Sequence, residues 1–296
     1  MKLSVKLLTI ASAAGMAGAI AFSTPINDTN ASAAKKTTKK VVKKTTKKSS
    51  KKATKAKSVT IYLTRHGETT GNVMGRVQGW SDFPLTTNGI KVADQLGYGL
   101  KGTKFKAAYA GNLTRQEVTA EHALKYSGNS KVKVNISKFL REGGYGSFEG
   151  DSIATDNNEI AGVYGYKDGT EFQQATGKDY WNMLQDAYYK LDQLNSHNTK
   201  LASADRAENS GMVQQRMTKE LNKIAKTTQK NGGGNVLVVS SGMSINEYLS
   251  TMAPNYTGAS IPNAAVTKLV YKNGKLSVNG PIASLSYVDK GAQMMK

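Results

Sequence analysis

The chain has 296 residues and carries 41 Lys and Arg side chains against 21 Asp and Glu, a net charge of +20, with no cysteine. The absence of cysteine excludes a disulfide framework and any thiolate metal site. Residues 1–57 hold 14 lysines and one acid, Asp28, so most of the excess charge lies there. Residues 58–296 hold 27 basic and 20 acidic side chains and are numerous enough to build one substantial core in a single α/β domain.

Residues 1–33 have the pattern of a secretory signal peptide. Lys2 and Lys6 precede an apolar run over residues 7–22, and residues 31–33 form an A-x-A cleavage pattern. The alternative is a retained membrane anchor, but the apolar run is rich in Ala and Gly and shorter than the roughly 20 residues of a bilayer span. We therefore expect a secreted or cell-surface protein, and export without any cysteine favours a bacterial source.

Residues 34–57 are predicted to be a disordered Lys-rich tail. Paired lysines alternate with Thr, Val, Ser and Ala, without any aromatic or acidic residue. This charge favours salt-sensitive binding to an anionic cell-wall polymer or a membrane surface. Nucleic acid is not expected as a partner, because no aromatic side chain is available for base stacking. A solubilising spacer with no specific partner fits the pattern equally well.

From residue 58 onward, strand and helix patterns alternate. The predicted elements, in chain order, are strand 58–63, helix 86–100, strand 105–109, helix 113–126, strand 132–136, helices 180–194 and 211–228, and strands 236–240, 265–271 and 275–279. A Lys-Asn-Gly turn at residues 272–274 joins the last two strands as a hairpin. The alternation predicts an α/β fold with a mainly parallel central sheet, helices on both faces and reactive groups at the carboxyl ends of strands.

The most informative segment lies at the end of the first predicted strand. Arg65 and His66 stand in the string LTRHGETTGN, residues 63–72. An imidazole beside a guanidinium can accept a phosphoryl group, because Arg offers forked donors to phosphate oxygens while neutral His attacks phosphorus. A lone Arg-His pair would be weak evidence, since such pairs are common on protein surfaces, but the surrounding string is far more specific.

This string resembles the signature of the histidine phosphatase superfamily, the phosphoglycerate-mutase-like enzymes. Three later segments resemble that family's motifs and follow in the same order: QGWSDFPLT from residue 78, AGNLTRQEVTA from residue 110 and LREGGYGSFEG from residue 140. The resemblance spans about residues 59–271. It implies a phosphoglycerate-mutase-like fold for residues 58–296, with an insertion or cap at about residues 151–210.

The resemblance also implies a role for each matching residue. His66 would form a phosphohistidine, and Arg65 and Arg115 would hold the phosphoryl oxygens. Asn72 would add a hydrogen bond to phosphate, and Glu142 would protonate the leaving oxygen before water hydrolyses the intermediate. This route needs no metal ion and no other cofactor.

Two of these roles have structural alternatives at this stage. Arg115 could instead form an ion pair with Glu117 or Glu121 on its own predicted helix. Glu142 could instead cap a loop.

The family's second histidine is absent from its expected position. The family pattern after a late apolar strand is V-x-x-x-S-H-G, whereas residues 236–242 read VLVVSSG, so Ser241 stands in place of that histidine. Serine can donate one neutral hydrogen bond to phosphate, and Gly242 can offer its backbone amide. The other two histidines, His122 and His197, are interpreted as structural or solvated because no motif surrounds them.

Two functions from different classes follow from these features. The first is a secreted phosphomonoesterase that hydrolyses a small phosphorylated molecule at a rate attenuated by Ser241, since losing one preorganised donor typically costs about 10²- to 10³-fold. The second is a catalytically weak or inactive family member that binds an anionic ligand or the cell surface. A mutase is not expected outside the cell.

Residues 151–210 are the segment in which we expect substrate specificity, because loops on a rigid scaffold commonly carry recognition. Its aromatic residues could line a cap over the phosphate pocket. The alternative is ordinary core packing of Trp181, Leu184, Tyr188 and Leu191, and their helical spacing favours it.

Overall fold

The computed structural model describes residues 57–195, 197 and 199–296. The predicted signal peptide and all of the Lys-rich tail except Lys57 lie outside the described residues. Within the part that is described, no helix combines the length and the hydropathy needed to cross a bilayer.

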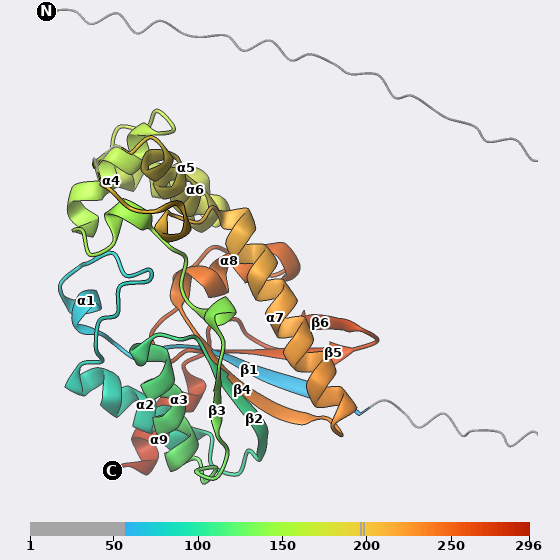
Figure 1. The fold of residues 1–296 in the computed structure, drawn as a ribbon. Coiled ribbons are helices and arrows are strands. Elements are labelled where there is room, and N and C mark those ends of the chain that lie inside the picture. Colours follow the sequence, from blue (N-terminus) through green and yellow to red (C-terminus); the bar gives the residue numbers. More distant parts are fainter. Residues whose placement is uncertain (1–56, 196, 198) are drawn as a thin grey trace, which may run out of the picture. The chain divides into compact units, whose positions relative to one another are not determined.

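A six-stranded sheet forms the centre of the domain (Figure 1). Its strands, in spatial order, are β3 (Val134–Ile136), β2 (Phe105–Ala110), β4 (Gly234–Ser240), β1 (Val59–Arg65), β5 (Val266–Lys272) and β6 (Lys275–Val278). The first four strands are parallel to their neighbours, whereas β5 is antiparallel to β1 and β6 to β5. The predicted mainly parallel sheet is thus confirmed, with an antiparallel hairpin at one edge.

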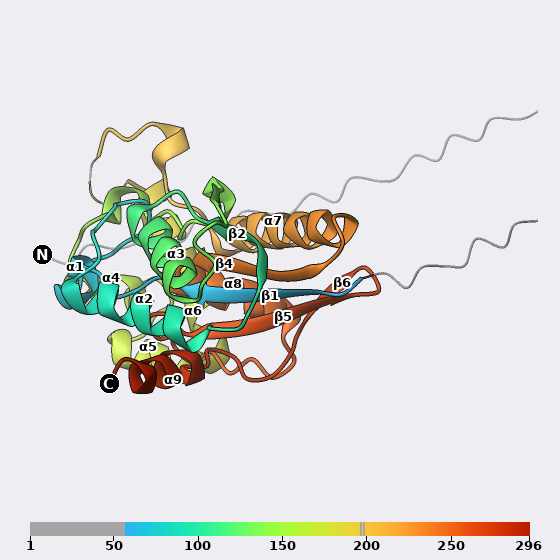
Figure 2. The same cartoon turned by 90° about the horizontal axis from the view of Figure 1, so that it is seen from below.

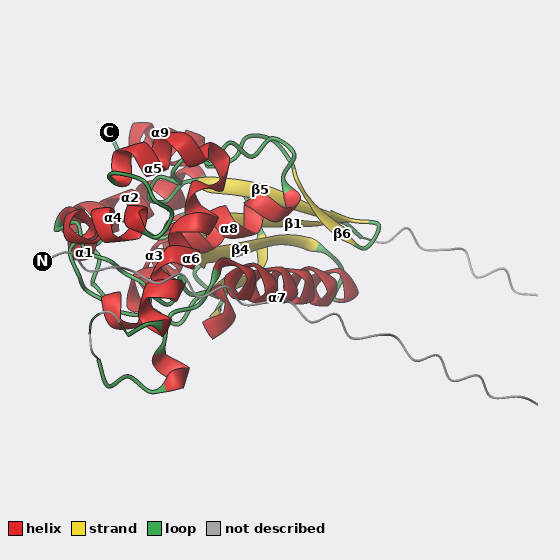
Figure 3. Cartoon of the chain, turned by 90° about the horizontal axis from the view of Figure 1, so that it is seen from above, coloured by secondary structure: helices red, strands yellow, loops and turns green. Residues whose placement is uncertain are grey.

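Helices cover both faces of the sheet, because strand side chains alternate between two buried clusters. Val236 and Val238 of β4 pack with Met217 on one face, whereas Leu237 and Val239 pack with other helices on the opposite face. The first face is covered by α7 (Ser210–Lys230) and α8 (Gly242–Met252), and the second by α2 (Thr87–Gly99), α3 (Thr114–Tyr126) and α9 (Ser286–Met294). Figures 2 and 3 show α7 and α9 on opposite sides of the sheet.

The helices α2 and α9 touch through glycine. A Cβ atom at Gly99 would collide with the backbone carbonyl of Tyr287, and one at Gly291 would collide with that of Gln95. Two helix backbones can approach this closely only where no side chain separates them. The helix α9 is therefore packed backbone to backbone against α2, although the two are far apart in the sequence.

A third buried cluster forms a helical cap that is built mainly from residues 151–210. Phe148, Ile160, Phe172 and Tyr188 are among its members. The cap helices are α4 (Ile153–Gly162), α5 (Gly169–Thr176) and α6 (Tyr180–Gln193). The remaining elements are α1 (Thr70–Val73) and the 3₁₀ turns η1 (Lys138–Leu140), η2 (Gly146–Phe148), η3 (Gly177–Asp179) and η4 (Ser203–Asp205).

Candidate active site

A cavity of about 280 Å³ lies where β1 and β4 end, and α4, α6 and α8 complete its wall. Its position agrees with the expectation that reactive groups gather at the carboxyl ends of parallel strands. Five of the seven predicted site residues line this cavity: Arg65, His66, Asn72, Glu142 and Gly242.

His66 follows β1 and is 3% exposed. Its backbone N–H donates to the Ser240 carbonyl at 3.0 Å, which ties the end of β1 to the end of β4. Its Nδ1 atom lies 2.7 Å from the Gly67 carbonyl oxygen. Because a carbonyl oxygen can only accept, Nδ1 is assigned the proton and Nε2 keeps a free lone pair.

The surroundings of His66 keep its imidazole neutral. Burial lowers the pKa of His66 well below its usual value of 6.5, and the cations Arg115 and Arg65 lower it further. The hydrogen bond to the Gly67 carbonyl is the opposing influence. A neutral imidazole with a free Nε2 lone pair is the form that can attack phosphorus.

Arg65 is held beside this imidazole by the loop after α8. Its Nη1 donates to the Ile261 carbonyl at 2.6 Å, while its buried Nε has no hydrogen-bond partner among the described residues. A Cβ atom at Gly242 would lie only 3.2 Å from that Nε, so a glycine here makes room for the guanidinium. An unpartnered buried N–H at a cavity wall is a donor that a bound anion can satisfy.

Arg115 is fully buried at the start of α3 and does not line the cavity. Its Nη1 donates to the Ser81 carbonyl at 2.8 Å, and its Nη2 donates to the carbonyls of Gln78 and Gly79 at 3.0 and 2.8 Å. Its ion-pair partner in the described chain is Asp82, at 3.8 Å, rather than Glu117 or Glu121 of its own helix. The positive charge of Arg115 acts on His66, and a direct bond to phosphate stays a prediction.

Glu142 lines the cavity and also caps a helix. Its Oε2 accepts the Met243 N–H at 3.0 Å, and its Oε1 accepts the Ser244 N–H at 2.7 Å and the Gly143 N–H at 3.1 Å. The first two donors belong to the first turn of α8, whose exposed N–H groups favour a carboxylate. The sequence allows Glu142 to cap a loop; in the structure it caps the helix α8, and it lines the cavity as well.

Asn72 lies in the short helix α1 and is fixed by a capping box with Thr69. Its Oδ1 accepts the Thr69 N–H at 3.1 Å, and its own N–H donates to the Thr69 hydroxyl at 3.0 Å. Because Oδ1 is engaged in this way, the amide NH₂ is the group that Asn72 can offer to a ligand.

Ser241 is fully buried at the N-cap position of α8 and does not line the cavity. Its Oγ accepts a hydrogen bond from Gln116 Nε2 at 2.7 Å. The next residue, Gly242, reaches the cavity, and its N–H is the first of α8, a position that has no partner within a helix. The predicted contact of Ser241 with phosphate thus stays a prediction, and its hydroxyl is already engaged by Gln116.

Two charged residues that the sequence reasoning missed hold the site loops in place. Glu149 accepts the backbone N–H groups of residues 79–81 and of Tyr145 at 2.7–3.1 Å. Arg216 forms an ion pair with Glu208 at 2.8 Å and donates to the Glu142 carbonyl at 2.8 Å. Glu149 lies inside the motif from residue 140, but nothing in a sequence shows that its carboxylate is engaged by backbone amides.

The other two histidines lie outside the cavity. His122 Nδ1 lies 2.6 Å from Asp94, and His197 lies 3.1 Å from Asp151 and 3.5 Å from Glu159. Both therefore have the structural surroundings that we expect for them.

The helix α6 supplies most of the aromatic wall of the cavity. Tyr180, Trp181, Leu184 and Tyr188 line it and also pack into the cap cluster. The two alternatives considered for this segment are thus not exclusive, because one helix face serves both core and cavity.

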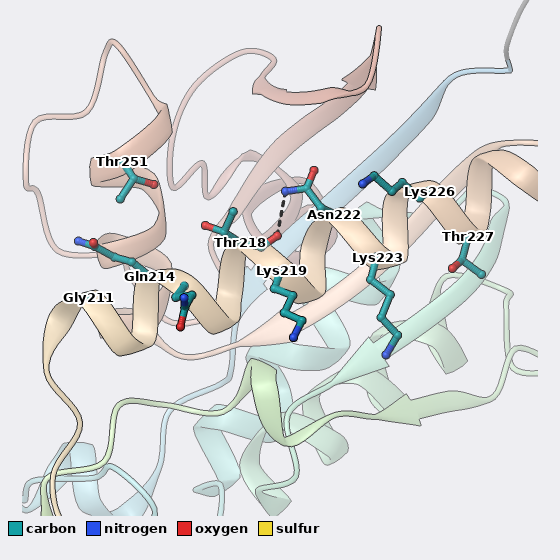
Figure 4. A pocket seen from close by; sticks show the side chains of 10 residues that line it. Gly211, Gln214, Thr218, Lys219, Asn222, Lys223, Lys226, Thr227 and Thr251 are labelled. Carbon is teal, nitrogen blue, oxygen red and sulfur yellow. Dashed lines mark hydrogen bonds between the residues drawn. The ribbon is translucent and has the colours of Figure 1, made fainter. Parts of the chain in front are cut away.

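A second hollow lies along the outer face of α7 (Figure 4) and is lined by polar and basic side chains. Lys219 and Lys223 project from α7 on the same side, and Asn222 Nδ2 donates to the Thr218 carbonyl at 2.8 Å. None of the predicted site residues lines this hollow. The candidate active site is therefore the cavity at His66. Among the described residues, no group of three or more His, Cys, Asp or Glu is suited to hold a metal ion.

Sequence comparison matches residues 61–177 and 168–281 to the histidine phosphatase superfamily, branch 1. A 2,3-bisphosphoglycerate-dependent phosphoglycerate mutase of Brucella anthropi is 38% identical over 95 residues, which cover 31% of this chain and 46% of that protein. The chain thus spans about half the length of the curated relatives it matches.

Structural comparison extends the similarity to most of the domain. The crystal structure of a phosphoglycerate mutase from Bacillus anthracis matches with a TM-score of 0.70 and 34% identity, covering 80% of this chain and 98% of that one. A mycobacterial glucosyl-3-phosphoglycerate phosphatase, 19% identical with a TM-score of 0.55 over 77% of this chain and 100% of that one, shares the fold alone. Together with the phosphoglycerate-mutase-like α/β fold, the family match shows that the chain belongs to the histidine phosphatase superfamily.

Proposed function

We propose that the protein is a phosphomonoesterase that transfers a phosphoryl group first to His66 and then to water. The observation that carries this proposal is the buried, neutral His66, whose Nδ1–H is held by the Gly67 carbonyl. The Nε2 lone pair forms the bond to phosphorus while the bond to the substrate oxygen breaks. Water then attacks phosphorus, the N–P bond breaks, and neutral His66 is regenerated.

The other groups at the cavity fit the remaining needs of this reaction. Arg65 Nε and the Gly242 N–H are donors for the phosphoryl oxygens, and the charge of Arg115 adds electrostatic stabilisation. Glu142 is the only carboxyl group that lines the cavity within the described chain. In this proposal Glu142 enters the first step protonated and gives its proton to the leaving oxygen. The carboxylate that results then takes a proton from the attacking water, which restores the starting form.

Hydrolysis is proposed in preference to a mutase reaction because residues 1–33 indicate export, where a phosphoglycerate pathway has no evident purpose. In the same proposal the Lys-rich tail holds the enzyme at an anionic cell-wall polymer or membrane surface. A second candidate, a weakly active or inactive anion-binding member of the family, is favoured by one observation. The hydroxyl of Ser241, at the position where the family motif predicts the second histidine, is engaged by Gln116, and Ser241 does not line the cavity.

The test compares the purified wild type with His66→Ala on a panel of phosphomonoesters that includes p-nitrophenyl phosphate. We expect wild-type turnover and a drop to background in the variant, because the nucleophile is missing. Trapping at neutral pH should label His66 with phosphate. The matched control is His122→Ala, which removes a histidine outside the cavity and should retain activity.

Equal turnover by the wild type and His66→Ala would contradict the proposal that the protein hydrolyses phosphomonoesters through His66. No turnover in either form, with inorganic phosphate still bound at millimolar concentration, would support the anion-binding alternative.

A further inference from the structure

Beyond its phosphoryl end, the cavity has a wall of apolar and aromatic side chains, while Gln78, Asn157, Asn246 and Ser260 add uncharged polar groups to the rest of the lining. The side chains of Tyr180, Trp181, Leu184 and Tyr188 come from α6, that of Ile153 from α4 and that of Met243 from α8. Binding an apolar group against such a surface is favourable, because the group is removed from water, whereas a small polar alcohol adds little to binding. This wall is therefore positioned to contact the organic part of a substrate rather than its phosphoryl group.

The aromatic part of this wall is held in place before any ligand arrives. Trp181 Nε1 donates to the Gly258 carbonyl at 2.7 Å, so the polar group of the indole is already satisfied. Tyr188 is 4% exposed, and its ring lies 4.8 Å from that of Tyr145 and 5.2 Å from that of Phe148. Side chains fixed in this way lose little conformational entropy when they contact a ligand.

Charge is scarce along the same wall. Arg76 is exposed and is the one cation of the described cavity lining besides Arg65, since His66 is neutral, and Glu142 is the one acid of that lining. A cationic alcohol would find no further carboxylate, and the carboxylate of a phosphoglycerate would find only Arg76. An uncharged organic group fits this balance better than either.

The size of the cavity limits that group to about one ring. In another protein, an engineered apolar cavity of about 150 Å³ holds benzene. A volume of about 280 Å³ is sufficient for such a ring together with a phosphoryl group.

We propose that this cavity selects phosphomonoesters whose leaving alcohol carries an uncharged apolar ring, an inference that rests on the proposed hydrolase activity. The ring packs against Trp181 and Leu184 while the phosphoryl group meets His66 and Arg65. Small polar phosphates such as phosphoglycerate are then poor substrates, because they leave this wall in contact with water.

The experiment compares benzyl phosphate with ethyl phosphate. Both leave as primary alkoxides, so the difference in kcat/KM reports contact with the ring rather than the ease of breaking the bond. We expect the wild type to favour benzyl phosphate by about 10- to 100-fold, the range for burial of one such group. An aryl phosphate would not serve, because its better leaving group raises the rate without any contact.

Two leucines of α6 provide a matched pair of variants. Leu184→Ala removes wall from the cavity and should lower kcat/KM for benzyl phosphate by about 5-fold or more, with little change for ethyl phosphate. Leu191→Ala removes the same side chain from the cap cluster away from the cavity and should leave the ratio of the two substrates unchanged. If the alanine variants fail to fold, Leu184→Met and Leu191→Met alter the same contacts with less loss of volume.

The outcomes separate this inference from the proposed function. Turnover of neither substrate, with p-nitrophenyl phosphate still hydrolysed in a His66-dependent way, would overturn ring selection alone. Turnover of none of the three would overturn the hydrolase itself. Turnover of both at equal kcat/KM, or an equal loss for both in the Leu184 variant, would overturn ring selection and leave the hydrolase standing.

Discussion

The imidazole of His66 is oriented by the backbone of Gly67 rather than by a carboxylate. The Gly67 carbonyl accepts the Nδ1–H of His66, and its N–H donates to the Thr119 hydroxyl at 3.0 Å. That hydroxyl in turn donates to the Arg115 carbonyl at 2.6 Å. The tautomer of the imidazole is thus fixed by a chain of neutral groups, and the hydrogen-bond partner of Nδ1 is a carbonyl oxygen rather than a carboxylate.

This arrangement predicts how stability depends on pH. Because the pKa of His66 is lowered well below 6.5 in the folded state, the unfolded chain gains a proton below pH 6.5 that the folded protein does not take up. The free energy of unfolding should therefore fall by about 1 kcal/mol more in the wild type than in His66→Gln between pH 6.5 and 5.5. Urea titrations at both values measure the difference.

The comparison must be made between variants, because other buried groups act in the opposite sense. Burial raises the pKa of Asp156 to about 6 and raises that of Glu247 well above its usual value. Both groups bind a proton more tightly in the folded state, so they add stability as the pH falls. Parallel pH curves for the wild type and His66→Gln would show that His66 is not held neutral.

Among the elements, those with a clear periodicity could be predicted and those without it could not. Each predicted strand and helix is present with ends within two residues, whereas α1, α4, α5, α8 and α9 lie outside the predicted elements. The helix α8 begins at Gly242 directly after a strand and is buried on nearly every side, so it lacks the polar face that marks a helix in a sequence. The helix α9 is short, and Gly291 interrupts it.

For the site, the sequence could predict which residues take part, but not which groups they contact. The sequence places His66 at the end of a strand and Arg115 near the start of a helix, and the structure has both there. It cannot show that Arg115 is occupied by carbonyls of residues 78–81 or that Glu142 caps α8, because these contacts join segments far apart in the sequence. Long-range backbone contacts of this kind leave no local pattern.

Two helix glycines make a paired prediction for the elements. Gly291→Ala should destabilise the protein by about 1–3 kcal/mol, because the new methyl group meets the backbone of α2, which cannot move aside cheaply. Gly162→Ala, at an exposed end of α4 with open space around it, should instead be neutral or add about 0.5 kcal/mol. Thermal and urea unfolding of both variants measure the two effects. Equal effects in the two helices would contradict the close contact of α2 with α9.

Across the whole molecule, charge is divided unevenly between the tail and the domain. Residues 35–56 hold 11 lysines and no acid, whereas residues 57–296 hold 28 basic and 20 acidic side chains. The carbonyl of Lys57 accepts a hydrogen bond from Gln229 at 3.2 Å, so the domain begins at or before this residue.

Deleting residues 35–56 should therefore separate binding from folding. We expect weaker retention on isolated cell walls or anionic vesicles, with the greatest loss at low salt, because these lysines attract anions over a Debye length of about 10 Å at 0.1 M salt. Thermal stability and turnover should change little, since Lys57 and the domain are kept. Cosedimentation at low and high salt measures retention. Unchanged retention would mean that the tail is only a spacer.

The glycine contact between α2 and α9 also sets an order in time. The ribosome makes α2 well before α9, and the loop that their contact closes spans most of the domain. Until residues 286–294 emerge, the narrow strip of α2 around Gly99 has nothing to cover it, and the core on that face of the sheet stays incomplete. The core on this face of the sheet is therefore completed only after residues 286–294 have been made, so folding of this face depends on a contact between two segments that are far apart in the sequence.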